Sequence, residues 1–234
     1  MKFEVVKELL CGVPYMAEDE GWELYNFICN EKPSSILELG HAHGASTIYM
    51  AAALDEIGSG VIETVDLSAA QDRDPNLEKL TLDSGLNEFI NIFREKNSYT
   101  WFLKKKIENC TSGYICEPIY DFCFIDGPKN WTIDGLAFFL VNKLLKNKAW
   151  ILFDDYLWTH GKHDGRESTD GITVRSLGNE ELEEPHIKLI FELLVMQSGE
   201  FSNFKIQDNW WAWAQKSKSG SKVLEHTSKM MTKN

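Results

Sequence analysis

The sequence has little proline, little cysteine and no long apolar run, and each scarcity excludes a class of protein. Its 234 residues include 6 Pro, 16 Gly and 5 Cys, and 43% of them are hydrophobic. These are the proportions of an ordinary globular chain, so collagen, intrinsic disorder and disulfide-dense scaffolds are excluded. No stretch approaches the run of about 18 apolar residues that a membrane span needs, so we expect no contact with a membrane.

Positive charge is also scarce. Lys and Arg number 24 against 36 Asp and Glu, which leaves a net charge of −12. An acidic surface repels phosphate backbones, so we expect no nucleic-acid partner. The charge is compatible with a small cationic ligand.

The five cysteines are odd in number and form no Cys-x-x-Cys pair. This usage favours a reducing compartment over a disulfide framework. Residues 1–10 alternate charged and apolar side chains, so we expect no signal peptide, and the expected location is the cytoplasm.

Apolar segments of two kinds alternate along the chain. Short, nearly continuous apolar runs typical of buried parallel strands are separated by segments with helical periodicity, and the last two strands follow one another without a helix. This order predicts an α/β fold with a Rossmann-like, doubly wound, mostly parallel seven-stranded sheet and a C-terminal antiparallel hairpin. The expected strands are 35–39, 61–66, 89–93, 120–126, 149–154, 204–206 and 211–214, and the expected helices are 45–54, 99–107, 133–145 and 187–196.

We expect one domain over residues 1–215, in which the helical segment 1–33 contributes to the cofactor and acceptor pocket. Residues 216–234 are polar and weakly basic and are interpreted as a flexible tail. Alternation places Trp211 and Trp213 on one face of the last strand, as hairpin core or as the contact of a homodimer.

In such sheets ligands bind at the carboxyl ends of the strands. The first strand ends in Glu38-Leu-Gly-His-Ala-His-Gly-Ala-Ser46, where Gly40 and Gly44 allow a ligand to approach the backbone closely. Alanines replace the second and third glycines of a dinucleotide motif, which disfavours a pyrophosphate; a simple tight turn is the alternative. His41 and His43 form a His-x-His pair that zinc or copper accepts, although loop polarity near a ligand is the favoured interpretation.

Asp66 closes the second strand, where a carboxylate accepts the hydroxyls of a ribose. The alternatives are a helix N-cap and a solvated loop acid. Together with the glycine turn, Asp66 implies a nucleoside without a diphosphate, and Glu38 beside the turn favours a cationic ligand or an amine. S-adenosylmethionine (SAM) meets this description, because it carries an adenosine, an amino group and a sulfonium but no phosphate.

On these motifs the chain resembles the class I SAM-dependent methyltransferases, and most of all the branch of catechol O-methyltransferase and its small bacterial relatives. The resemblance covers roughly residues 14–155. It implies a SAM site formed by the glycine motif, the ribose acid, an adenine edge after the third strand and a methionine near the sulfonium. The matching positions are Met16, Glu38, Gly40, Gly44, Ser46, Asp66, Asn97, Ser98 and Asp126.

The same resemblance implies a magnesium site at Asp126, Asp154 and Asp155, where the branch often has Asp-Asn at the second pair. Three oxygen donors at strand ends suit a hard divalent cation. Lys129 matches the catalytic lysine of the branch, and a lysine held near neutral pKa would take the proton of the acceptor hydroxyl. The alternative is that Asp126 and Asp154 cap turns and that Lys129 pairs with one of them.

The long polar segment 156–185 follows the fifth strand at the ligand end and is typical of a lid or a binding loop. His160 and His163 within it are candidate general bases. The resulting hypothesis is a SAM-dependent O-methyltransferase acting on a small hydroxylated acceptor, with Asp126, Lys129 and His160 as catalytic residues and Mg²⁺ as an assisting metal. The alternatives are a metal-dependent oxygenase or hydroxylase on the same fold and a non-catalytic scaffold.

Overall fold

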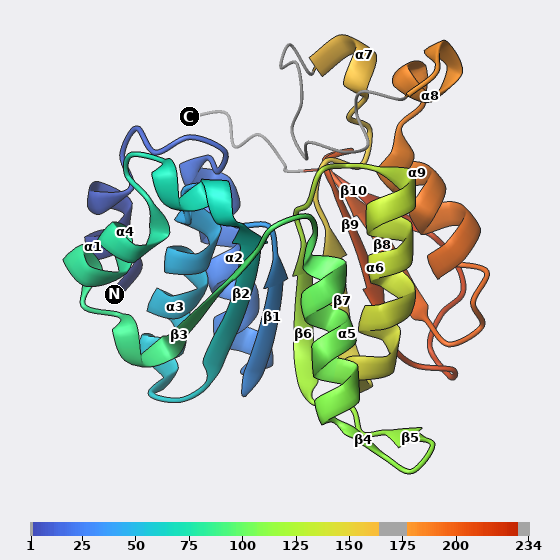
Figure 1. The fold of residues 1–234 in the computed structure, drawn as a ribbon, viewed down its shortest axis with the longest axis horizontal. Coiled ribbons are helices and arrows are strands. Elements are labelled where there is room, and N and C mark those ends of the chain that lie inside the picture. Colours follow the sequence, from blue (N-terminus) through green and yellow to red (C-terminus); the bar gives the residue numbers. More distant parts are fainter. Residues whose placement is uncertain (1, 164–176, 229–234) are drawn as a thin grey trace. The chain divides into compact units, whose positions relative to one another are not determined.

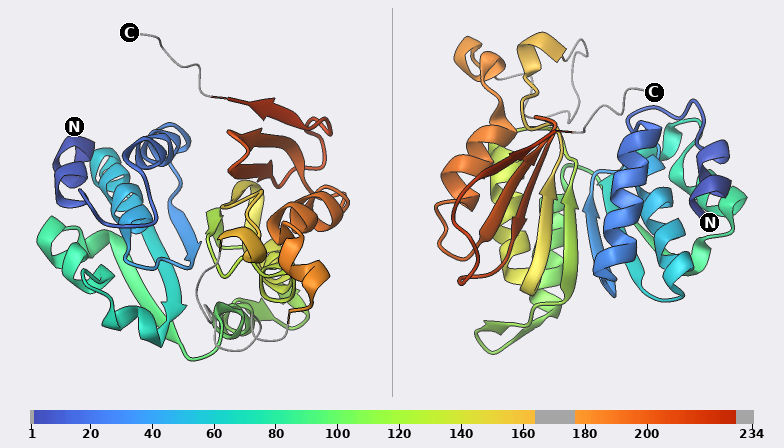
Figure 2. Two further views of the ribbon diagram at one scale, coloured as in Figure 1. Left: turned by 90° about the horizontal axis from the view of Figure 1, so that it is seen from above. Right: turned by 180° about the vertical axis from the view of Figure 1, so that it is seen from behind.

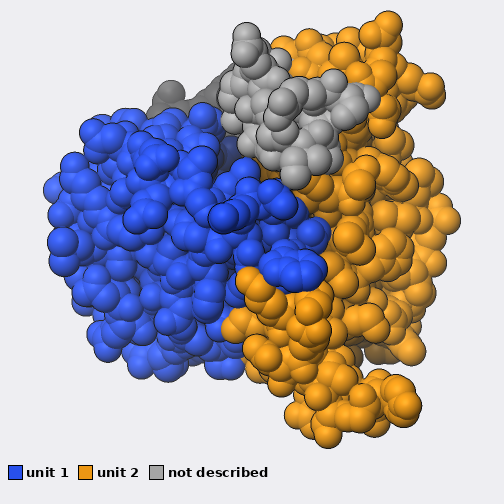
Figure 3. Space-filling model, viewed as in Figure 1, with its two compact units in different colours: residues 1–102 blue, residues 103–234 orange. Residues whose placement is uncertain are grey.

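The computed structural model describes residues 2–163 and 177–228 (Figure 1). The chain forms two compact units, Met1–Phe102 and Leu103–Asn234, which Figure 3 shows in different colours. None of the described helices combines the length and the apolar character needed to cross a membrane.

The first unit contains a parallel sheet in the order β1-β2-β3. Ile36 of β1 pairs with Ile62 of β2, which pairs with Ile90 of β3. Helices precede and connect the strands (Figure 1), as expected for parallel β-α-β units. The elements are α1 (Lys2–Leu9), α2 (Glu18–Glu31), β1 (Ser35–Leu39), α3 (Ala45–Ile57), β2 (Val61–Leu67), η1 (Ser68–Asp72), α4 (Leu77–Ser84), η2 (Asn87–Phe89) and β3 (Ile90–Glu95).

Helix α3 is the central helix of this unit. Its residues 45–54 are all buried, and α3 packs against α1, α2 and α4 as well as β2. A helix that is covered on every side must be apolar all round, which its Ala-, Ile- and Met-rich sequence satisfies. Helix α2 approaches it closely at Gly21, where an added Cβ would lie 2.2 Å from the Tyr49 ring.

The second unit contains strands in the order β6-β7-β9-β8-β10. Strands β6 and β7 are parallel, β9 runs antiparallel to both β7 and β8, and β10 is parallel to β8. Figure 2 shows these strands together with the helices of the unit from two further directions. The elements are α5 (Tyr99–Asn109, which begins in the first unit), β4 (Thr111–Ser112), β5 (Ile115–Cys116), β6 (Tyr120–Ile125), α6 (Trp131–Leu144), β7 (Leu145–Phe153), α7 (His160–His163), α8 (Asn179–Glu183), α9 (His186–Leu189), η4 (Ile190–Val195), β8 (Ser202–Gln207), β9 (Trp211–Gln215) and β10 (Glu225–Thr227).

The predicted α/β class, the mostly parallel strands and the closing antiparallel hairpin are confirmed. The strand count differs from the prediction. Apart from the short β4-β5 pair, the described residues of the two units form eight strands rather than seven. The additional strand, β10, lies within the predicted tail 216–234, and its backbone pairs with β8 although all three of its residues are exposed. Backbone pairing of this kind leaves no hydrophobic pattern for a sequence argument to detect. The single-domain organisation stays a prediction.

Trp211 and Trp213 belong to the core of the hairpin. They are only 3% and 5% exposed, and the Trp213 ring stacks on Phe122 of β6. Of the two interpretations of these side chains, the structure supports hairpin core. Because these two side chains are buried, they do not offer a contact surface for a homodimer, and the homodimer stays a prediction.

Candidate functional site

The glycine turn of the first unit adopts the conformation that its sequence predicts. Gly40 follows β1 with φ 88° and donates a hydrogen bond to the carbonyl of Val65, and Gly44 begins α3 with φ 104°. Ala42 between them also has a left-handed backbone, with φ 48°. Such values favour glycine, and at Gly44 an added Cβ would lie 2.5 Å from a Leu77 methyl carbon.

Asp66 lies at the carboxyl end of β2 and holds this turn. Its Oδ2 accepts hydrogen bonds from the backbone N–H groups of His41 (2.9 Å) and Ala42 (2.7 Å), and its Oδ1 accepts one from Leu67 (2.6 Å). The half-buried carboxylate is therefore oriented by three amides. A carboxylate has about four lone-pair positions, so it retains capacity for a further donor such as a ribose hydroxyl.

Glu38 lies beneath the turn and is fully buried. Its carboxylate accepts hydrogen bonds from the hydroxyls of Ser46 (2.5 Å), Thr47 (2.5 Å) and Thr64 (2.6 Å). These hydroxyls come from α3 and β2, so Glu38 joins β1 to both. The contacts assign Glu38 and Ser46 to support of the turn, and direct binding of a ligand by either residue stays a prediction.

His41 extends the Glu38 network to the third strand. Because the Thr64 hydroxyl donates to Glu38, it accepts from His41 Nδ1 at 2.8 Å, which leaves Nε2 to accept from the Arg94 guanidinium. Arg94 also forms a bidentate ion pair with Glu78 of α4, at 2.8 and 2.9 Å. Burial, opposed by Asp66 and reinforced by Arg94, lowers the pKa of His41 to about 4. The neutral imidazole is thus a buried structural link, a role that the sequence did not predict, and no metal-ligand group of the described residues includes it.

The remaining predicted cofactor positions of this unit lie in connecting segments. Met16 is half-buried in the segment that precedes α2, and Asn97 is exposed after β3. Ser98 directly precedes α5, and its Oγ accepts a hydrogen bond from Thr100 N at 3.1 Å. The roles of these three residues in cofactor binding stay predictions.

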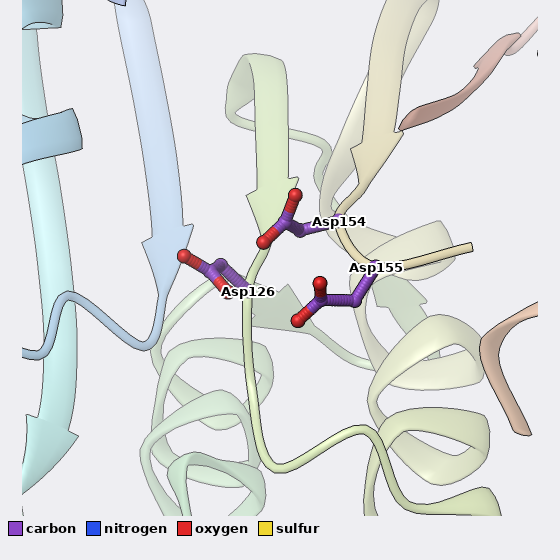
Figure 4. A group of neighbouring side chains, drawn as sticks. All are labelled: Asp126, Asp154 and Asp155. Atoms are coloured by element: carbon purple, nitrogen blue, oxygen red, sulfur yellow. The ribbon is translucent and has the colours of Figure 1, made fainter. Parts of the chain in front are cut away.

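Three carboxylates gather at the strand ends of the second unit (Figure 4). Asp126 follows β6, and Asp154 and Asp155 follow β7, which is parallel to β6. One oxygen of each lies within 4.8 Å of the others, and this is the only group of three or more potential metal ligands in the part of the chain that the structure describes. The predicted convergence of these three residues is confirmed, and none of the described histidines belongs to the group.

Lys129 is the counter-ion of this acid cluster, which we define as Asp126, Asp154 and Asp155. Its Nζ forms an ion pair with Asp126 and lies 3.1 Å from Asp155 Oδ2 and 4.0 Å from Asp154 Oδ2. Burial acts to lower the pKa of Lys129, but the charges of Asp126, Asp155 and Asp154 outweigh it and hold the pKa well above its ordinary value. The expectation of a lysine near neutral pKa is therefore wrong for this arrangement, because three carboxylates stabilise the ammonium form.

In the carboxyls of the cluster, burial raises the pKa instead of lowering it, because it disfavours the charged form. Burial, together with the charges of Asp126 and Asp155, raises the pKa of Asp154 well above its usual value. Burial also raises the pKa of Asp126, although Lys129 opposes the shift. Trp211 donates its indole N–H to Asp154 Oδ1 at 2.7 Å, a contact between β9 and the cluster that the sequence analysis missed because it spans 57 positions.

His160 contacts the backbone of Lys129. It is 2% exposed, and its Nε2 donates to the backbone carbonyl of Lys129 at 3.1 Å. This contact does not support the general-base hypothesis for His160, which stays untested. The side chain of His163 and residues 164–176 of the polar segment lie outside the described residues.

A family model of the methyltransferase domain matches residues 37–156, which is just over half of the chain. The chain belongs to the methyltransferase domain family. The matched region of this methyltransferase begins in β1 and ends just after Asp155, so it contains the glycine turn, Asp66, the acid cluster and Lys129.

Solved structures with the same fold include several methyltransferases. The O-methyltransferase from Bacillus cereus in complex with SAH is 20% identical, with a TM-score of 0.61 over 92% of this chain and 90% of that one. The O-methyltransferase TomG from Streptomyces achromogenes, involved in tomaymycin synthesis and solved with SAM, is 14% identical, with a TM-score of 0.59 over 92% and 87%. The SAH-bound methyltransferase PaMTH1 from Podospora anserina is 14% identical, with a TM-score of 0.61 over 92% and 86%. Curated protein sequences give no match.

Proposed function

We propose that this methyltransferase transfers the methyl group of SAM to a hydroxyl oxygen of a small acceptor, with Mg²⁺ bound by the acid cluster. The observation that carries the proposal is the convergence of three carboxylates and one lysine at the ends of β6 and β7, in a chain of the methyltransferase domain family. Non-catalytic scaffolds have no need to concentrate like charges in this way, since the arrangement destabilises the fold.

The first unit supports SAM as the methyl donor. The glycine turn and the oriented Asp66 carboxylate suit a ribose. Solved neighbours of the same fold were obtained with SAH and with SAM.

The acid cluster fits a divalent cation. In the ionised state, three carboxylates and one ammonium would have a formal charge of −2, which one Mg²⁺ would balance. Burial and the charges of Asp126 and Asp155 raise the pKa of Asp154, and a cation at the cluster would favour its ionised form. Carboxylate oxygens are the ligands that Mg²⁺ prefers, and three of them leave room for water or an acceptor oxygen.

Methyl transfer is an in-line displacement at the sulfonium methyl, so positioning of the two reactants supplies much of the rate. A bound metal would lower the pKa of an acceptor hydroxyl that coordinates it. Asp126, Asp154 and Asp155 would hold that metal, and its charge would compete with Lys129 for the carboxylates. Lys129, released from three anionic partners, would lose the interactions that now keep it protonated and would accept the hydroxyl proton.

Calorimetry tests the donor assignment. We expect the wild-type protein to bind SAM and SAH, and we expect Asp66→Ala to lose most of this affinity because it removes the acceptor of the ribose hydroxyls and loosens the turn. Asp83→Ala is the matched control, since Asp83 is an exposed acid on α4, and its affinity should equal that of the wild type. Absence of SAM and SAH binding to the folded wild-type protein would refute the proposed donor.

A methyl-transfer assay tests the acceptor class and the metal. We expect transfer from SAM to members of a panel of small hydroxylated compounds, loss of activity in EDTA and recovery with Mg²⁺. Lys129→Met should lower kcat by about 100-fold or more, the range of a general base. Full activity in EDTA would exclude the metal-assisted mechanism while leaving the donor assignment intact.

A further inference from the structure

Lys129 has an unusual backbone for the residue that carries the proposed base. Its φ is 58°, in the left-handed region that a lysine rarely adopts. Such a conformation is unfavourable and persists only where surrounding contacts impose it. Hydrogen bonds from outside the segment 129–131 reach its backbone at both ends.

Two histidines provide these contacts. His160 of α7 donates from Nε2 to the Lys129 carbonyl at 3.1 Å, and His186 of α9 accepts the Trp131 backbone N–H on Nδ1 at 3.0 Å. Because Nδ1 of His186 accepts, its Nε2 carries the proton, and it donates to the carbonyl of Glu181 at 2.7 Å. Both histidines are buried, and their rings meet edge to face with centroids 5.3 Å apart.

Asn130 lies between these two contacts and forms hydrogen bonds with residues of α6. Its backbone N–H donates to Asp134 Oδ2 at 2.6 Å, and its side chain caps the helix by accepting from the N–H groups of Thr132 and Ile133. The segment 129–131 is thus fixed at three consecutive residues. The contacts of His160 and His186 come from described residues that follow β7 in the chain.

We propose that His160 and His186 are positioning residues that fix the left-handed backbone of Lys129 and so hold its ammonium group at the acid cluster. The inference rests on the proposed function for its effect on methyl transfer. Its structural part, the placement of the Lys129 ammonium, is independent of the reaction. Loss of either histidine releases one end of the segment, and the lysine side chain then leaves Asp155 and Asp126.

The direct test is NMR of the protein labelled with ¹⁵N-lysine. A buried, ion-paired ammonium gives a slowly exchanging Nζ signal, which we would assign to Lys129 by its absence in Lys129→Met. We expect His160→Leu and His186→Leu to shift or remove this signal. We expect His160→Gln to retain it, because the glutamine Nε2 can donate to the same carbonyl. Asn142→Ala controls for general loss of stability, since it removes the hydrogen bond to Glu200 elsewhere on α6 and should leave the signal unchanged.

Kinetics provide the second arm. We expect His160→Leu to lower kcat by about 10-fold to about 100-fold, as displacement of a catalytic group does, with KM for SAM unchanged and with rescue by His160→Gln. An unchanged Lys129 signal in His160→Leu and His186→Leu would overturn the inference, as would wild-type kcat in both. A wild-type protein that transfers no methyl group would refute the proposed function alone, and the NMR result would still decide the positioning role.

Discussion

At the residue scale, His41 shows how one buried side chain can support the glycine turn. It lies between Thr64 and Arg94 and carries the hydrogen-bond network from Glu38 on β1 to Glu78 on α4. The network works only with a neutral imidazole, because Nε2 must accept from a permanently charged guanidinium. Its role is therefore to keep the glycine turn in place.

This role predicts a pH dependence of stability. The pKa of His41 is lowered to about 4 by burial, and its unfolded value is near 6.5. Between these values the unfolded chain binds a proton that the folded chain excludes, so the stability that is complete above pH 6.5 falls by about 3 kcal/mol as the pH falls towards 4. Urea unfolding at pH 7.0, 5.5 and 4.5 should show a smaller loss in His41→Asn than in the wild type. Equal losses in both proteins would contradict the assignment.

At the element scale, the start of α3 depends on a conformation that only glycine adopts without cost. Gly44 at its N-terminus and Gly58 at its C-terminus both have a positive φ, 104° and 81°. They differ in surroundings, because Leu77 lies against Gly44 and nothing lies within 4 Å of the Cβ position at Gly58. Substitution of Gly44 therefore tests the effect of packing against Leu77, and Gly58 on the same helix is the control.

We expect Gly58→Ala to lower the free energy of unfolding by about 1 kcal/mol, the cost of a left-handed alanine. Gly44→Ala should cost about 3 kcal/mol or more, because its Cβ would also lie 2.9 Å from Leu77 Cβ and 3.2 Å from Leu77 Cα, which cannot rotate away. Gly44→Ala should also weaken SAH binding, whereas Gly58→Ala should not. Chemical denaturation and calorimetry measure both effects, and equal destabilisation by the two variants would refute the packing argument.

At the scale of the whole molecule, the chain carries a net charge of −12 and still concentrates three acids in one cluster. This concentration lowers stability at neutral pH. Because the pKa of Asp154 is raised by burial and by Asp126, its stabilising contribution is complete only below the unfolded pKa of an aspartate and is lost as the pH rises through the raised value. The cluster is a cost to the fold that a bound cation would offset.

The Asp154→Asn variant separates the destabilisation by clustered charge from the stabilisation by a bound cation. Asparagine resembles the neutral carboxyl and can still accept the Trp211 indole N–H, so at pH 7.5 without metal we expect the variant to melt at or above the wild-type temperature. Mg²⁺ at about 100 times its Kd should stabilise the wild type by about 3 kcal/mol and the variant hardly at all. Thermal unfolding with and without Mg²⁺ measures both the effect of the substitution and the effect of the metal. A variant that melts well below the metal-free wild type, or that keeps the full Mg²⁺ effect, would contradict the account.

The sequence by itself determined the order of the seven strands and four helices that it predicted, because buried parallel strands and covered helices need apolar residues at fixed spacings. It also placed Asp66, Asp126, Asp154 and Asp155 correctly at strand ends, since the carboxyl end of a strand can be read from where its apolar run stops. The pairing of Lys129 with one of these acids was part of the alternative interpretation, and its ion pair with Asp126 is present.

Only the tertiary structure decided what these residues touch. The contacts of His41 with Arg94, of Trp211 with Asp154 and of His186 with Trp131 each join residues more than 50 positions apart, and no periodicity records them. The protonation of Lys129 was decided in the same way, because a pKa depends on which charges surround the group in space. Strand β10 likewise forms through backbone pairing, to which its exposed side chains give no clue.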